Sequence, residues 1–271
     1  MLSPFRPDSV AAAQRRAVSM KTRENKMRLK LVLALSLILP MWAFADDHMP
    51  PTNIAAVYEC NLMGGVTADD VAAFGAGKFK NWVGKNDYNV GSYLWEAVAV
   101  SPPFNEPDMR WVNYFQSWSD YFEISEGWER SGKLAEEFAT MATCDKARFA
   151  IGMRTGGAAP QAKEKPLIAS VCQLNDGKTL QDAIAFMPKA TSVINATADA
   201  SITTFLWSNF VGVAGLDYIA FFTGETAEMV KVMDGVKNGT FTSAFAEAEL
   251  MPPATCESDL HQSHEMVRAA G

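Results

Sequence analysis

Four cysteines are the residues of this chain with the widest choice of chemistry, because thiolates act as nucleophiles, bind metals and form disulfides. Redox-active and zinc-binding cysteines commonly occur as Cys-x-x-Cys, and the sequence has no such pair. Instead, the interval from Cys60 to Cys144 equals the interval from Cys172 to Cys256. Four cysteines allow three connectivities. If two similar segments fold separately, Cys60 pairs with Cys144 and Cys172 with Cys256, as structural disulfides.

A single shift, the one that places Cys60 on Cys172, superimposes the chain on itself and supports two such segments. Nine of the identities in this register mark the repeat. Besides the cysteines, they are Leu62 and Leu174, Gly65 and Gly177, Thr67 and Thr179, Asp70 and Asp182, Phe74 and Phe186, Leu94 and Leu206, and Trp95 and Trp207. We infer a tandem duplication.

The histidines offer only a weak metal-binding pattern. On a helix, His261, His264 and Glu265 would share a face, whereas on a strand the two imidazoles would point to opposite faces. The corresponding part of the first segment, from Arg148 to Ile151, has no histidine. We therefore predict no metal and no cofactor. The sequence also lacks Gly-x-Ser-x-Gly, His-Glu-x-x-His and a phosphate-binding loop, since no Lys-Ser/Thr follows Thr155-Gly156-Gly157.

Aromatic residues in matching positions give a more informative pattern. In an extended segment Tyr93 and Trp95 share one face, as do Phe205, Trp207 and Asn209 in the second copy. If these faces meet, they form an aromatic pocket with few polar groups, which is typical of a small-molecule site. Candidate ligand-binding residues are Tyr93, Trp95, Asn113, Phe205, Trp207 and Asn209, with Glu96 a further polar candidate. The alternative is that the aromatic side chains only fill the core.

Each copy reads as strand, helix, strand, strand, helix, strand. Predicted strands cover 54–62, 90–100, 110–116 and 148–154 in the first copy, and 167–174, 202–213, 217–223 and 260–268 in the second. The first helix of each copy begins with a capping-box pattern, Thr67 to Asp70 and Thr179 to Asp182. Gly75-Ala76-Gly77 and Met187-Pro188-Lys189 align, so we expect a kink or early end there. Further helical segments follow at 119–142 and 226–249.

This order is that of the ferredoxin-like unit, and two such units resemble the dimeric α/β-barrel superfamily. We predict an α+β fold in which tandem βαββαβ units pack as a pseudo-dimeric barrel. With the pattern Cys-x-Leu-x-x-Gly-x-Thr-x-x-Asp, a central aromatic strand and a closing cysteine, residues 53–268 also resemble a group of uncharacterised secreted proteobacterial proteins. The resemblance implies no particular activity, because members of the superfamily include cofactor-free monooxygenases, haem-associated enzymes and isomerases.

The N-terminal residues resemble an export signal. Arg28 and Lys30 precede an apolar run, 31–39, and Ala43-Phe44-Ala45 precedes Asp46, so we predict cleavage after Ala45 and a periplasmic or secreted product. The apolar run is too short for a membrane anchor. We assign residues 1–45 to a polar extension with the signal peptide, 46–154 to repeat 1, 155–166 to an exposed linker and 167–271 to repeat 2.

Charge and composition narrow the functional classes. Residues 46–271 contain 16 basic and 29 acidic residues, a net charge of −13, without a basic cluster. We therefore expect no nucleic-acid binding and no membrane insertion after cleavage. The sequence favours a protein that binds a small apolar or aromatic ligand. The alternatives are a monooxygenase-like or isomerase-like enzyme and an envelope protein-interaction module, and the sequence does not indicate an oligomeric state beyond the internal pseudo-dimer.

Overall fold

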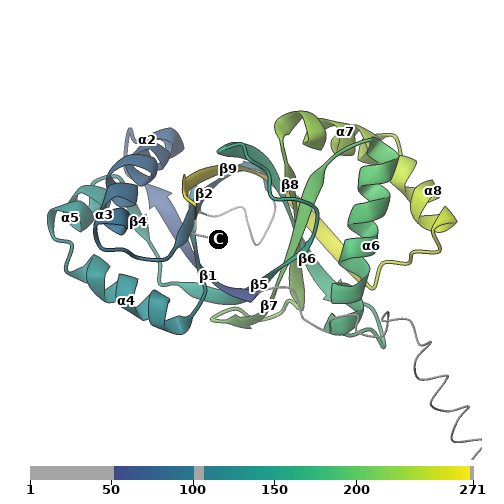
Figure 1. The fold of residues 1–271 in the computed structure, drawn as a ribbon, viewed down its shortest axis with the longest axis horizontal. Coiled ribbons are helices and arrows are strands. Elements are labelled where there is room, and N and C mark those ends of the chain that lie inside the picture. The colour runs from purple at the N-terminus through teal and green to yellow at the C-terminus, as the bar shows by residue number, and fades with distance from the viewer. Residues whose placement is uncertain (1–51, 101–106, 269–271) are drawn as a thin grey trace, which may run out of the picture. The chain divides into compact units, whose positions relative to one another are not determined.

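The computed structural model describes residues 52–100 and 107–268 (Figure 1). These residues belong to one compact unit, 49–271. The predicted signal peptide and its cleavage point lie outside the described residues. The elements of the first half are β1 (Thr52–Leu62), α2 (Ala68–Phe74), the π-helix η1 (Gly75–Phe79), α3 (Lys80–Lys85), β2 (Gly91–Ala99), β3 (Met109–Phe115), α4 (Trp118–Glu129), α5 (Lys133–Ala139), β4 (Ala142–Cys144) and β5 (Arg148–Gly156).

The second half repeats this order without the short strand β4. Its elements are β6 (Glu164–Leu174), α6 (Leu180–Ala198), β7 (Ile202–Val211), β8 (Tyr218–Gly224), α7 (Thr226–Lys237), α8 (Thr240–Glu247) and β9 (Ala254–Val267). No helix in the described part of the chain is both long and apolar enough to span a membrane.

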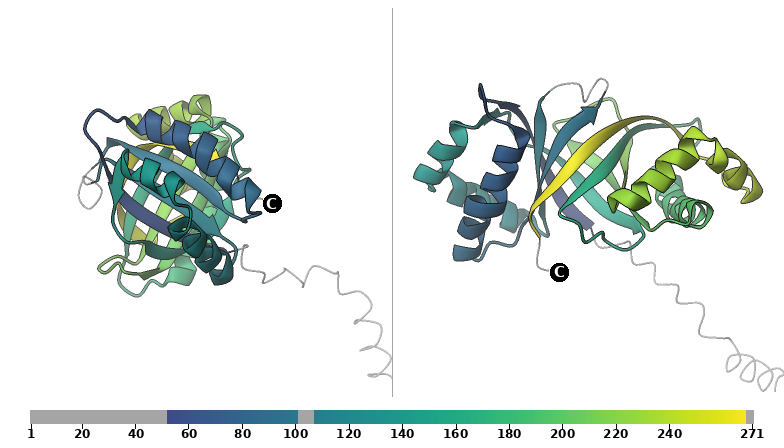
Figure 2. Two further views of the ribbon diagram at one scale, coloured as in Figure 1. Left: turned by 90° about the vertical axis from the view of Figure 1, so that its left-hand side faces the viewer. Right: turned by 90° about the horizontal axis from the view of Figure 1, so that it is seen from above.

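The strands form one antiparallel sheet that closes on itself. Its order is β3-β2-β9-β6-β8-β7-β5-β1-β4, and β3 also pairs with β1, so eight strands complete a ring to which β4 is appended. Within the ring, the first half contributes β5-β1-β3-β2 and the second half β9-β6-β8-β7. When β4 is left out, both runs consist of the fourth, first, third and second strand of their half. The halves join through the pairs β2–β9 and β5–β7. The fold is therefore an α+β barrel, in which the helices cover the outside of the strands (Figures 1 and 2).

Local sequence explains how the first helix of each half begins. The Thr67 hydroxyl accepts a hydrogen bond from the backbone of Asp70, whose carboxylate accepts one from the backbone of Thr67. Thr179 and Asp182 make the same reciprocal contacts at α6. Both predicted capping boxes are confirmed, and each satisfies two backbone N–H groups that helical bonds leave free.

Two disulfides connect the same positions of each half. Cys60 lies directly opposite Cys144 in the β1–β4 pair, and Cys172 lies opposite Cys256 in the β6–β9 pair. These are the pairings predicted from the equal spacing, and the described part of the chain leaves no cysteine free. Each bond ties the first strand of a half to the segment that closes it.

The predicted weak point of the first helix differs between the halves. In the first half the α-helix changes to the π-helix Gly75–Phe79, and Gly75 lets β9 approach, because a Cβ here would lie 1.9 Å from the Met266 sulfur. In the second half α6 continues through Pro188 to Ala198, so the expected early end is wrong there. The apolar face of α6, including Met187 and Ile194, is buried and offsets the proline's missing hydrogen bond.

Candidate functional site

The barrel interior is lined by aromatic residues from both halves. Trp95 on β2 and Trp207 on β7 stack with ring centroids 5.1 Å apart, and each is only 4% exposed. Phe221 contacts both indoles, at 5.3 and 4.6 Å, and stacks on Phe205 at 4.5 Å. The predicted meeting of the two tryptophan faces is thus what the structure shows, and these rings join the two halves into one core.

The aromatic packing does not fill the barrel. A cavity of about 320 Å³ remains at the end where β1 and β6 begin. Its walls are mainly apolar, with Lys165, Glu265 and Arg268 on the side of β6 and β9 and Arg154 on β5. The lining residues are Asn53, Gly91, Tyr93, Trp95, Tyr114, Gly152, Met153, Arg154, Ala159, Pro160, Lys165, Leu167, Thr203, Phe205, Trp207, Thr223, Ser263, Glu265 and Arg268. We call this space the barrel cavity.

The connection between the halves contributes to the cavity wall. Residues 157–163, here called the strap, follow β5 and precede β6, and Ala159 and Pro160 of the strap line the barrel cavity. Gly157 begins the strap with φ of 73°, and a Cβ here would lie 2.0 Å from the Ile202 carbonyl oxygen, so the close approach requires glycine. The Thr203 hydroxyl donates a hydrogen bond to the Ala158 carbonyl. The strap therefore packs against the start of β7.

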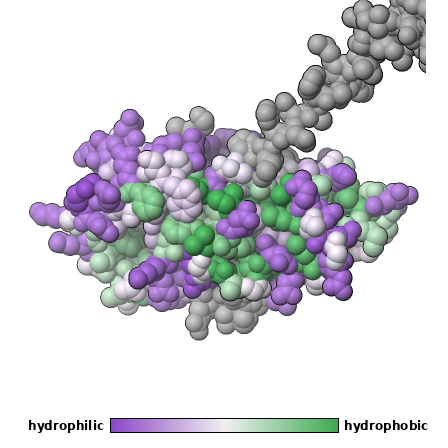
Figure 3. Space-filling model, turned by 90° about the horizontal axis from the view of Figure 1, so that it is seen from below, coloured by the Kyte–Doolittle hydropathy of each residue, from purple (hydrophilic) through white to green (hydrophobic). Residues whose placement is uncertain are grey.

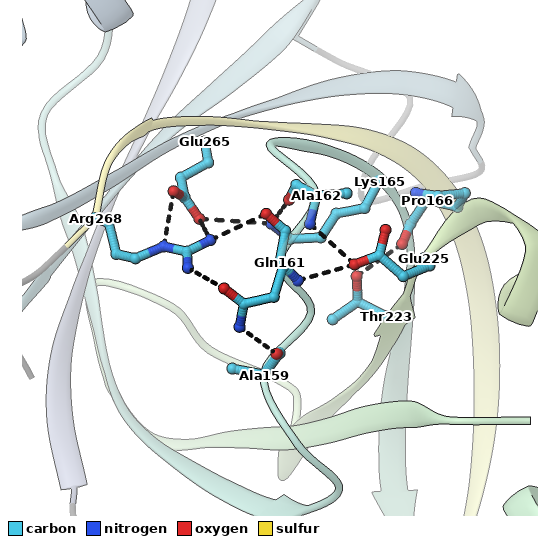
Figure 4. A network of polar contacts seen from close by, with 9 residues as sticks. All are labelled: Ala159, Gln161, Ala162, Lys165, Pro166, Thr223, Glu225, Glu265 and Arg268. Carbon is cyan, nitrogen blue, oxygen red and sulfur yellow. Dashed lines mark hydrogen bonds and ion pairs between the residues drawn. The ribbon is translucent and has the colours of Figure 1, made fainter.

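Charged side chains fix the other end of the strap (Figure 4). Glu225 Oε1 accepts hydrogen bonds from the backbone N–H groups of Gln161 and Ala162, at 2.8 and 2.9 Å. Arg268 Nη1 donates to Gln161 Oε1 at 2.8 Å. Lys165 Nζ donates to the Ala162 carbonyl at 2.8 Å. The strap is thus held in place by Lys165 of β6, by Arg268 directly after β9 and by Glu225 directly before α7.

The Glu265 carboxylate lies close to two cationic side chains beside the cavity. Arg268 Nε and Nη2 each lie 2.9 Å from an oxygen of Glu265, while Lys165 Nζ lies 3.7 Å from Glu265 Oε2. Lys165 is only 6% exposed, and its Nζ lies 5.6 Å from the centre of the Tyr93 ring. The ammonium group therefore faces an aromatic ring as well as the shared carboxylate.

Burial changes the acid–base properties of these groups. It lowers the pKa of Lys165, an effect that the negative charge of Glu265 opposes. Burial and, to a smaller extent, the Glu265 charge raise the pKa of Tyr93 to about 12. Burial raises the pKa of Tyr114 well above its usual value. Both phenols therefore stay neutral at physiological pH and can donate hydrogen bonds.

A second polar group lies elsewhere among the barrel strands. Arg110 on β3 is buried and lies 3.4 Å from Glu59 Oε1, while Arg148 Nη1 lies 2.6 Å from Glu59 Oε2. His261 on β9 is 1% exposed, with its ring centroid 6.4 Å from that of Trp95. Burial, with the positive charge of Arg110 second, lowers the pKa of His261 to about 4. His261 is therefore neutral at neutral pH.

The structure separates the predicted site residues into two groups. Tyr93, Trp95, Phe205 and Trp207 line the barrel cavity, and their role in ligand binding stays a prediction. Asn113 lies on the opposite side of the sheet, where its Oδ1 accepts hydrogen bonds from Ser92 Oγ at 2.7 Å and Trp111 Nε1 at 2.9 Å. It lies beneath the helices and does not line the barrel cavity.

Asn209 and Glu96 also lie outside the cavity wall. Asn209 is exposed and has φ of 50°, close to a shift in the β5–β7 register that ends the regular alternation of β7. Glu96 Oε2 lies 3.6 Å from His264 Nε2, and neither residue lines the cavity. His264 and His261 lie on β9 three residues apart, and no group of three metal-ligating side chains occurs within residues 52–100 and 107–268.

Lys165 is the main cavity residue that the sequence interpretation missed. It was assigned to an exposed linker, but β6 starts at Glu164, and Thr155 and Gly156 likewise belong to β5. The available signal was alternation, since Lys165, Leu167 and Ala169 have one phase and all are buried.

A second cavity lies in the first half, between the outer face of its strands and its helices. It measures about 720 Å³. Aromatic residues dominate its wall, among them Trp82, Trp111, Trp128 and Phe138, and Ala135 and Ala139 line it from α5. We call it the helix-side cavity, and an apolar probe could enter it as well as the barrel cavity.

Apolar side chains also reach the outer surface. Trp118, Phe122 and Val211 are exposed, and Trp118 contacts Phe149, the residue that pairs with Val211 across β5 and β7. Figure 3 shows a face on which hydrophobic residues gather between hydrophilic ends. Scattered apolar residues are normal on a protein surface.

Comparisons with known proteins give little beyond the fold. No family model matches the chain, and no curated protein matches its sequence. A mutant chlorite dismutase from Candidatus Nitrospira defluvii is 9% identical with a TM-score of 0.48, and the match covers 80% of this chain and 93% of that one. An anthrone oxidase-like protein is 9% identical with a TM-score of 0.46, covering 81% and 96%. At these values neither match carries an inference about activity, so the site must be argued from its own geometry.

Proposed function

We propose that this protein binds a small, largely aromatic molecule in the barrel cavity. The observation that carries the proposal is a space of about 320 Å³ walled by Tyr93, Trp95, Tyr114, Phe205 and Trp207. Pockets of this volume, mainly apolar with a few placed polar groups, are the usual form of small-molecule sites. Aromatic walls favour aromatic ligands, because offset and edge-to-face ring contacts add to the burial of apolar surface.

The same cavity weighs against the other two functions considered from the sequence. An interaction module needs a filled barrel and an apolar docking surface, whereas this barrel is partly empty. An enzyme needs reactive polar groups that converge on the ligand, and two of the candidates, Asn113 and Asn209, do not reach the cavity. A binding protein requires only the space and the placed donors.

The wider assignment follows from the repeat and the cysteines. The identical strand order in the two halves supports tandem ferredoxin-like units packed as a pseudo-dimer, encoded by repeats 46–154 and 167–271. Two disulfides fit an oxidising compartment, which supports export to the periplasm or the medium, with cleavage after Ala45. The resemblance to secreted proteobacterial proteins remains an inference from the sequence motifs.

A fluorescent apolar probe tests the proposed site. N-phenyl-1-naphthylamine, which is uncharged and brightens in apolar surroundings, should bind the wild-type protein. Ser263 is buried and lines the barrel cavity, so Ser263→Leu should fill the space and weaken probe binding about tenfold or more. Mass spectrometry of the natively purified protein, without added probe, should show a co-purifying small molecule.

The helix-side cavity supplies the matched control. Ala139→Leu adds the same side chain at the exposed edge of that cavity and should leave probe affinity unchanged. Thermal melts of both variants establish that each is folded before titration. Loss of binding in Ala139→Leu with retention in Ser263→Leu, or no binding by the wild-type protein, would contradict the proposal.

A further inference from the structure

We propose that the ligand of the barrel cavity carries an anionic group, such as the carboxylate of an aromatic acid, that binds Lys165 beside Arg268. The inference rests on the proposed function and specifies its ligand class. It is supported by the charge of the cavity wall, the hydrogen-bonding capacity of Lys165 and the difference between the two halves.

The charged residues of the wall do not balance. Among the described residues, three cations line the barrel cavity, Arg154, Lys165 and Arg268, against one anion, Glu265. The Glu265 carboxylate already accepts both hydrogen bonds of a bidentate Arg268 contact. An excess of positive charge in a partly desolvated wall favours an anionic ligand, although residues 46–271 as a whole are acidic.

Lys165 retains capacity for a further acceptor. An ammonium group has three N–H donors, and the Ala162 carbonyl accepts one at 2.8 Å. Glu265 Oε2 lies 3.7 Å away, too far for a normal hydrogen bond. A carboxylate entering the cavity beside Tyr93 can therefore bind Lys165 without displacing the Arg268–Glu265 pair.

The second half supplies two of the three cavity cations, Lys165 and Arg268. The repeat register that places Cys60 on Cys172 also places Asn53 where the second half has Lys165, and Tyr93 where it has Phe205. These last four residues all line the cavity. The wall thus places Lys165, Glu265 and Arg268 beside Tyr93, while the side of Phe205 and Trp207 has Arg154 and Asn53 as polar neighbours. This polarity would orient a ligand that has an aromatic body and one charged end.

Two probes with the same ring system test the inference. Isothermal titration calorimetry compares 2-naphthoate with 2-naphthalenemethanol, which differ in charge. Wild-type protein should bind 2-naphthoate at least about tenfold more tightly than 2-naphthalenemethanol. The reason is that hydrogen bonds between charged groups are stronger than hydrogen bonds between neutral groups. Lys165→Met keeps the apolar stem and leaves Glu265 paired with Arg268. It should abolish the preference for 2-naphthoate while changing the affinity for 2-naphthalenemethanol by less than about twofold.

Controls separate a charge effect from a folding effect. Lys163→Met removes an exposed lysine two residues away and should keep the preference, as should Lys165→Arg. If Lys165→Met does not fold, Arg154→Gln, at an exposed position of the cavity rim, should still lower the preference measurably. Equal or tighter wild-type binding of 2-naphthalenemethanol would overturn the anionic inference and leave the cavity as a site for neutral molecules. Failure of both probes to bind would overturn the proposed function, and the inference with it.

Discussion

Because His261 is buried in its neutral form, the free energy of unfolding should fall as the pH is lowered. Its pKa is about 4 in the folded protein, because burial and the Arg110 guanidinium disfavour the imidazolium, against 6.5 when the residue is solvated. Since the unfolded chain takes up the proton first, the contribution of His261 is fully present above pH 6.5. It is lost progressively as the pH falls from 6.5 to about 4. A difference of this size corresponds to about 3 kcal/mol in total, and to about 2 kcal/mol between pH 7.5 and 5.

Urea melts of wild-type protein and His261→Gln at pH 7.5 and 5 measure this contribution. Other groups titrate in both proteins, so the loss of unfolding free energy between pH 7.5 and 5 is compared between the two. The wild type should lose about 2 kcal/mol more than the variant. The groups facing this region from other strands, Arg110, Glu59 and Arg148, are unchanged in the variant. Equal losses in both proteins, or an NMR titration placing the His261 midpoint near 6.5, would refute the assignment of a buried neutral imidazole.

Two further predictions concern the repeated elements. Thr67→Ala and Thr179→Ala should each lower the free energy of unfolding by about 1 kcal/mol in urea melts, because each removes the hydroxyl that caps a helix; no change in either would contradict the capping role. Replacing Cys60 and Cys144 together by serine should cost about 4 kcal/mol in the chain-entropy model, and peptide mapping without reduction should find only Cys60–Cys144 and Cys172–Cys256 in the wild type; a Cys60–Cys172 peptide would contradict both the pairing and the two-unit fold.

Repetition made much of the fold predictable. A single helix start such as Thr67 to Asp70 is a weak signal, but its recurrence at Thr179 in the repeat register gives two independent observations of one element. The same doubling selected the disulfide pairing and placed Trp95 and Trp207 at matching positions, where the structure stacks them. Local pattern and global fold agree at these positions.

The sequence does not show which face of the sheet each residue of the central strands belongs to. β3 is buried on both faces, with Trp111 and Phe115 toward the helices and Val112 and Tyr114 toward the barrel interior, so apolar residues do not alternate with polar ones. Nothing in the sequence then shows to which face Asn113 belongs. For Asn209, alternation counted from Trp207 fails because the β5–β7 register shifts nearby and the residue adopts positive φ.

The strap shows why composition alone misjudged the link between the halves. Its glycine, alanine and proline residues are typical of an exposed linker, yet small residues also allow a segment to pass close over a cavity. The deciding contacts come from residues distant in the sequence, because Glu225 and Arg268 bind the strap from much later elements of the chain. A duplicated barrel would be symmetric if its two halves were identical. The single strap joining them, and Lys165 where the first half has Asn53, make the two sides of the cavity different, and under the proposed function this asymmetry would orient a ligand.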